Sequence, residues 1–100
     1  MIYISGGITG IAFCKLHFDK AESYLKSKGC VPINPHKICS LLPTLSHSEY
    51  MTVCMALLSL CDTIYMLKGY ERSKGAMVEL EYAREHGYKV VNEDDRSNVD

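Results

Sequence analysis

The sequence lacks the features that would assign it to a disulfide-rich or zinc-binding class. It has no tryptophan, only three prolines and an odd number of cysteines, none of which form a Cys-x-x-C pair. An odd count without such pairs argues against a disulfide framework and against a zinc ribbon. We expect these cysteines to be small buried side chains in a reducing compartment. They are Cys14, Cys30, Cys39, Cys54 and Cys61.

An excess of charge of either sign is also missing. Eleven Lys and Arg residues against 12 Asp and Glu residues give a formal net charge of -1. This balance does not favour binding to a nucleic acid polymer or to an anionic membrane. No apolar run approaches the ~18 residues of a membrane span, and the first residues lack the basic region of a signal peptide. We therefore expect a soluble, cytoplasmic protein.

What the sequence does contain is an alternation of short apolar strands and longer helices. Its 100 residues, 47% of them hydrophobic, suffice for one domain with one core. Strands are expected over 1–5, 30–35, 62–68 and 88–92, helices over 11–28, 46–60 and 76–86, and a loop or short helical turn over 36–47. This order predicts a single α/β domain over residues 1–92, with a parallel sheet and helices on both faces. Residues 93–100 form an acidic, polar tail that we expect to fray.

The expected helix over 46–60 is apolar on nearly all sides. Ser46 or Ser48 can cap its start, and no charged residue lies between Glu49 and Asp62. A helix of this kind must be covered on most of its surface. We expect a second subunit to pack against residues 50–60, which predicts a homodimer or a higher homo-oligomer. The alternative is that the chain itself wraps the helix.

Two loops follow strands at the edge of the sheet where parallel α/β folds bind ligands. The first leaves the first strand and enters the first helix. Its glycines allow close approach of a ligand, and its backbone N–H groups can bind an anion such as a phosphate. The alternative is a purely structural turn. The loop consists of Ser5, Gly6, Gly7, Ile8, Thr9 and Gly10.

The second loop, residues 68–75, leads into a helix that carries a candidate nucleophile. Ser73 is a natural N-cap, and free N–H groups follow at Lys74, Gly75 and Ala76. Glu79 shares a helix face with Gly75, Ala76 and Ala83, so its carboxylate is expected in a recess, biased towards ionisation by the helix dipole. A recessed, ionised carboxylate beside an anion site suits a nucleophile that attacks a sugar carbon. The alternative is a helix residue paired with Arg72 or Lys74.

Four segments, taken in order, resemble the nucleoside 2-deoxyribosyltransferase superfamily, which also contains the deoxynucleoside 5'-monophosphate N-glycosidases. These segments are residues 3–10, 33–35, 61–67 and 73–83, and the likeness spans residues 1–92. The resemblance implies a flavodoxin-like or Rossmann-like three-layer fold of about four strands in the order 2-1-3-4. It also implies a homo-oligomer, a nucleoside or nucleotide substrate and no cofactor. Its chemistry would be cleavage of an N-glycosidic bond through a glutamyl-sugar intermediate.

The resemblance also assigns roles to residues of this sequence. It makes Glu79 the nucleophile, places Ser73 at the sugar or its 5' group, and lays the first loop along the nucleotide. The full set of expected substrate-binding residues is Tyr3, Ser5, Gly6, Gly7, Ile8, Thr9, Gly10, Asn34, Asp62, Arg72, Ser73, Lys74 and Gly75.

The sequence departs from the resembled families at two places. Cys54 stands where better-known members have an aspartate used in positioning and acid–base chemistry. Gly7 and Thr9 stand where the monophosphate hydrolases have serine and arginine, so phosphate recognition is weakened or has moved to Arg72 and Lys74. Both departures leave open a catalytically silent nucleotide-binding protein on the same fold. His36 could protonate a leaving base, or could simply be solvated.

Overall fold

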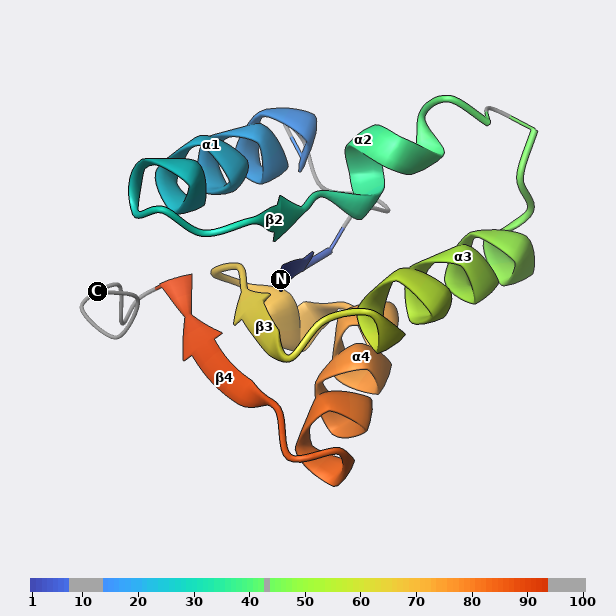
Figure 1. Ribbon diagram of the computed structural model, residues 1–100. Helices are drawn as coiled ribbons and strands as arrows, with labels where there is room; N and C mark the ends of the chain where they lie inside the picture. Colours follow the sequence, from blue (N-terminus) through green and yellow to red (C-terminus); the bar gives the residue numbers. More distant parts are fainter. Residues whose placement is uncertain (8–13, 43, 94–100) are drawn as a thin grey trace.

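A computed structural model describes residues 1–7, 14–42 and 44–93 of the chain (Figure 1). The strands are β1 (Ile2–Ser5), β2 (Pro32–Ile33), β3 (Thr63–Met66) and β4 (Lys89–Asn92). The helices are α1 (Cys14–Ser27), α2 (Pro35–Cys39), α3 (His47–Ser59) and α4 (Lys74–Glu85), with a short 3-10 turn, η1 (Tyr70–Arg72), before α4.

The four strands form one parallel sheet in the order β2-β1-β3-β4, which confirms the predicted fold class. In the register of this sheet, Tyr3 of β1 lies beside Ile33 of β2 and Ile64 of β3, and Ile64 lies beside Val90 of β4. The β2 strand is at the edge of the sheet, as the proline in it predicts, because proline cannot donate to a neighbouring strand.

Alternate side chains of the strands enter two separate cores, one on each face of the sheet. Tyr3, Ile64 and Met66 pack with α3 and α4, whereas Ile4 and Tyr65 pack with α1. The first core is completed by Cys54, Leu58, Leu80 and Ala83, and the second by Phe18, Ala21, Leu25, Leu67 and Val91. Burial on both faces explains why the strands are almost uniformly apolar.

The predicted second strand is longer than the observed one. It stops at Ile33 because the next residue, Asn34, caps α2 and accepts a hydrogen bond from the backbone N–H of Lys37 at 3.1 Å. Pro35 then occupies the first turn of α2, where a missing N–H has no cost. The prediction of a strand through Pro35 is therefore wrong, and α2 lies partly in the segment expected to be a loop or short turn.

Serine side chains begin the two helices that matter for the site. Ser46 caps α3 in a reciprocal arrangement with Glu49, which selects Ser46 over Ser48 as the cap. Ser73 accepts a hydrogen bond from the backbone N–H of Ala76 at 3.2 Å and so caps α4, as predicted. With its cap at Ser73, α4 begins at Lys74, two residues before the predicted start.

The apolar helix α3 is covered only in part by its own chain. Cys54 and Leu58 are buried, while Val53, Met55 and Leu57 are half-buried against the first core. Leu60, directly after the helix, is 66% exposed. The covering of this surface by a second subunit stays a prediction, which sedimentation equilibrium of the purified protein would test.

Glu93, the first residue of the expected tail, is held in place. Its carboxylate accepts a hydrogen bond from the backbone N–H of Lys68 and bonds the His17 ring, both at 2.7 Å. The expectation of fraying is therefore wrong at this residue, and residues 94–100 lie outside the described part of the chain. None of the described helices has the length and apolar character needed to cross a membrane.

Candidate active site

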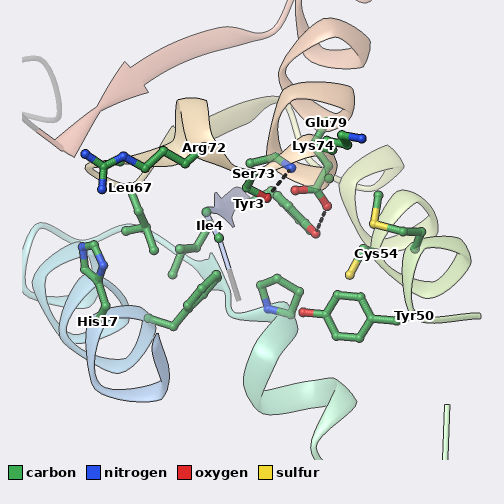
Figure 2. Close-up of a pocket in the computed structure, with 18 of the residues that line it drawn as sticks. Tyr3, Ile4, His17, Tyr50, Cys54, Leu67, Arg72, Ser73, Lys74 and Glu79 are labelled. Atoms are coloured by element: carbon green, nitrogen blue, oxygen red, sulfur yellow. Dashed lines mark hydrogen bonds between the residues drawn. The ribbon is translucent and has the colours of Figure 1, made fainter. Parts of the chain in front are cut away.

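A cavity of about 1010 Å³ opens beyond the carboxyl end of β1. Its walls come from the end of β1, from α1, from the start of α3, and from the segment that joins β3 to α4 (Figure 2). The size suits a ligand as large as a nucleotide. Residues that line it and enter the argument below are Tyr3, Gly6, Gly7, His17, Leu45, His47, Tyr50, Met51, Cys54, Lys68, Arg72, Ser73, Lys74, Gly75 and Glu79.

The carboxylate of Glu79 is fixed in this cavity by two hydroxyl groups. The residue lies in the second turn of α4 and is only 5% exposed. Ser5 donates a hydrogen bond to Oε1 at 2.6 Å. The Tyr3 phenol donates one to Oε2 at 2.5 Å (Figure 2). Tyr3 and Ser5 alternate along β1, so both face α4. One donor on each oxygen orients the carboxylate and leaves further lone pairs for a reacting atom.

Burial raises the pKa of Glu79 to about 6, although the hydrogen bonds from Ser5 and Tyr3 act in the opposite direction. The expected bias towards ionisation is therefore wrong in its net direction, because the loss of hydration outweighs the charge-stabilising contacts. Glu79 is still ionised for the most part at neutral pH. A carboxylate that is poorly hydrated but ionised is a better nucleophile than an exposed one.

The other titratable groups beside Glu79 stay protonated. Burial raises the pKa of the Cys54 thiol to about 12; the neighbouring Tyr3 hydroxyl opposes this change and the Glu79 charge reinforces it. Burial, followed by the Glu79 charge, also holds the pKa of the Tyr3 phenol above its ordinary value. Tyr3 is therefore a hydrogen-bond donor, and Cys54 cannot exchange protons near neutral pH as an aspartate would.

Positive charge dominates the rim of the cavity. Lys68, Arg72 and Lys74 have exposed side chains there, while Glu79 is the sole carboxylate among the lining residues that the structure describes. Within the same part of the chain, no ion pair joins Glu79 to Arg72 or Lys74, which removes the alternative drawn from the sequence. These three cations make the rim suitable for an anionic ligand.

Most of the residues predicted to bind substrate come together here. Eight of the described ones line the cavity or contact Glu79: Tyr3, Ser5, Gly6, Gly7, Arg72, Ser73, Lys74 and Gly75. Ile8, Thr9 and Gly10 lie outside the described residues.

Asn34 and Asp62 are the two exceptions, because the structure does not bring either of them to the cavity. Asn34 caps α2 and donates hydrogen bonds to Asp19 and Glu22, each at 3.1 Å, so its polar groups are used within the fold. Asp62 precedes β3, at the amino end of the sheet and opposite the cavity. Its side chain is 83% exposed and lies 3.5 Å from the amino group of Met1.

Close packing against Leu67 explains why residue 6 is a glycine. A Cβ atom at this position would lie 2.8 Å from Cδ1 and 2.9 Å from Cβ of Leu67, which is closer than carbon atoms approach. Gly6 therefore lets the chain leave β1 against the residue that follows β3. The same contact brings Gly6 next to the segment that leads into α4.

Sequence analysis missed several lining residues on α1 and α3, among them His17, His47 and Tyr50. Tyr50 could have been found, because it lies four residues before Cys54 and so shares its helix face. His36, considered as a proton donor, is not among the lining residues and stacks on Phe18 with ring centres 5.7 Å apart.

Comparison with known proteins identifies a family without a known activity. The family model described as Domain of unknown function (DUF4406) matches residues 1–92. No curated protein and no solved structure matches the chain.

Proposed function

We propose a function for this chain, which belongs to the family of the domain of unknown function DUF4406. The chain is an N-glycosyl hydrolase or transferase that cleaves the N-glycosidic bond of a 2'-deoxynucleoside or of its 5'-monophosphate. The observation that carries the proposal is the buried Glu79 carboxylate, oriented by Tyr3 and Ser5 in a nucleotide-sized cavity. The order of the sequence motifs, which resembles the nucleoside 2-deoxyribosyltransferase superfamily, supports the same conclusion.

The reaction takes place in two displacements at C1' of the sugar. In the first, a Glu79 oxygen forms a bond to C1' while the C1'–N bond breaks. The electron pair of the C1'–N bond leaves with the base, and the base takes a proton from water. In the second, a water oxygen attacks C1', the ester bond to Glu79 breaks, and the carboxylate is restored as water loses its proton to solvent. A second base in place of water gives transfer instead of hydrolysis.

Tyr3 and Ser5 act as positioning residues in this scheme. Each holds one carboxylate oxygen, so the attacking lone pair keeps a fixed direction towards C1'. Fixed geometry of this kind lowers the barrier because orientation is established before the reaction. Since both residues belong to β1, their positions are set by the sheet and not by a loop.

The cationic rim supports a substrate with a 5'-phosphate. Arg72 and Lys74 flank Ser73, and all three line the cavity together with the first turn of α4. Backbone N–H groups at the start of a helix and nearby cationic side chains both stabilise a phosphate. We infer that this segment binds the phosphate end while Glu79 faces the sugar.

The test is release of free base from the four common 2'-deoxynucleosides and their 5'-monophosphates, followed by chromatography. We expect the wild-type protein to release base from at least one of them. Charge-assisted hydrogen bonds to Arg72 and Lys74 should favour the monophosphate by roughly 10-fold or more in kcat/KM. Binding of these compounds without any release of base would contradict the proposed reaction.

One observation favours a second candidate, a nucleotide-binding protein without turnover. Glu79 is the sole carboxylate among the described lining residues, whereas glycoside cleavage commonly uses two. Cys54 does not replace the second one, because its thiol stays protonated. A nucleotide that raises the melting temperature yet is recovered intact after long incubation would identify this case.

The pH dependence of the reaction follows from the ionisation of Glu79. Since the nucleophile must be ionised, kcat/KM is expected to rise with pH and to level off above about 6. The hydrogen bonds from Tyr3 and Ser5 lower the pKa of Glu79, so Tyr3→Phe and Ser5→Ala should each move this limb to higher pH. Tyr70→Phe removes a phenol that does not line the cavity and should leave the limb in place. If the wild type and the three variants all show the same pH limb, the limb does not report the ionisation of Glu79.

A further inference from the structure

The hydroxyl group of Tyr50 is a polar group that the proposed reaction leaves unused. Tyr50 lies in the first turn of α3 and lines the cavity, and its ring lies below Tyr3, Glu79 and the Cys54 thiol in the view of Figure 2. The hydroxyl oxygen is buried beside the Cys54 thiol, and it makes no hydrogen bond of good geometry with any residue that the structure describes. A buried hydroxyl without a partner costs free energy, so its presence in the wall of a cavity calls for an explanation.

The surroundings of this hydroxyl make it a donor. Burial, and then the neighbouring Cys54 thiol, hold the pKa of the phenol above its ordinary value, with smaller contributions from Cys39 and Glu79. Tyr50 therefore keeps its proton throughout the neutral range. A group in this state can donate a hydrogen bond to an acceptor on a ligand, but it does not transfer the proton outright.

The layout of the cavity indicates which part of a nucleotide meets this donor. Arg72 and Lys74 belong to the segment that leads into α4, whereas Tyr50 belongs to α3, and in the proposed reaction Glu79 faces C1' of the sugar. The base leaves from the side of C1' opposite the attacking carboxylate. Beside Tyr50, the cavity is lined by Leu45 and Met51 as well as by Ser46 and His47, and the two apolar side chains suit the flat face of a heterocycle.

We propose that the Tyr50 hydroxyl donates a hydrogen bond to an acceptor atom of the heterocyclic base, a ring nitrogen or a carbonyl oxygen. This inference rests on the proposed function and extends it to recognition of the base. The bond forms with the bound substrate and strengthens as the electron pair of the C1'–N bond moves onto the base. Tyr50, one helix turn before Cys54, thus supplies a hydrogen bond to the base but no proton transfer.

Binding measurements in the Glu79→Gln background test the contact without any turnover. Two ligands are compared by calorimetry: a 2'-deoxynucleoside 5'-monophosphate that binds the protein, and 2-deoxyribose 5-phosphate, which has no base. Adding Tyr50→Phe should weaken binding of the nucleotide by ~10-fold and leave binding of the sugar phosphate unchanged. Tyr70→Phe serves as the matched control and should change neither affinity.

The stability of the variant separates a ligand contact from a structural role. Because the hydroxyl has no described partner, Tyr50→Phe should keep or raise the melting temperature. If Tyr50→Phe changes neither affinity, or weakens both ligands equally, the contact with the base is overturned. If Tyr50→Phe weakens binding of the nucleotide alone, and the wild-type protein never releases base, the contact with the base is supported and only the glycosidase reaction is overturned. A wild-type protein that binds neither ligand would overturn both.

Discussion

Replacing Glu79 with glutamine is expected to lower the rate of base release by ~10³-fold or more. Glutamine has nearly the same shape and can keep a hydrogen bond with Tyr3 or Ser5. Its amide is a poor nucleophile and cannot form the ester with C1' on which the proposed reaction depends. The effect should appear in initial rates measured by chromatography, while the affinity for the nucleotide changes much less.

Glu81→Gln is the matched control for this experiment. Glu81 lies on the same helix, two residues further on, and its side chain is exposed to solvent. The substitution removes the same charge without touching the cavity, so the rate should stay within about 2-fold of wild type. A Glu79→Gln protein that retains a tenth or more of the wild-type rate would show that Glu79 is not the nucleophile.

The arrangement of strands and helices could be predicted because the relevant signals are local. Apolar runs of four or five residues, glycines after the helices and serine caps all act within a few residues of the element they define. The end of β2 could not be predicted in this way. Asn34 leaves the strand because its side chain bonds Lys37, Asp19 and Glu22, and two of these partners belong to α1.

The recess around Glu79 could be predicted from its small neighbours on α4, but its hydrogen-bond partners could not. Tyr3 and Ser5 precede Glu79 by 76 and 74 residues, and they meet it only because α4 packs on the face of the sheet where both β1 side chains point. Asp62 shows the opposite case. The strand predicted over 62–68 is present as β3, but Asp62 lies at the amino end of that strand, away from the cavity.

The ionisation of Glu79 could not be predicted because two opposing effects had to be weighed. The sequence indicates the helix dipole, whose effect near a helix start is typically below ~1 kcal/mol. The degree of burial is known only from the structure, and it decides the direction of the pKa change. This balance has a consequence for the stability of the whole protein.

Glu79 is expected to make the stability of the protein depend on pH. Its pKa is about 6 in the folded protein against a reference value of 4.5, so the folded state binds this proton more tightly than the unfolded state. The resulting stabilisation is fully present below about 4.5 and is lost as pH rises through about 6. At ~1.4 kcal/mol for each unit of pKa, the loss amounts to about 2 kcal/mol. At neutral pH, the buried and ionised Glu79 therefore lowers the free energy of unfolding of the wild-type protein.

Urea unfolding of the wild-type and Glu79→Gln proteins between pH 4 and pH 8 measures this cost. Other titrating groups affect both proteins alike, so the difference between their free energies of unfolding isolates Glu79. Between pH 4 and pH 7, we expect Glu79→Gln to gain about 2 kcal/mol in free energy of unfolding relative to wild type. The corresponding difference between Glu81→Gln and wild type should not change with pH. A difference that does not change with pH would mean that Glu79 titrates equally in the folded and unfolded states. The hydrogen bonds from Tyr3 and Ser5 would then cancel the effect of burial on the pKa, and the limb of kcat/KM should lie near 4.5 instead of about 6.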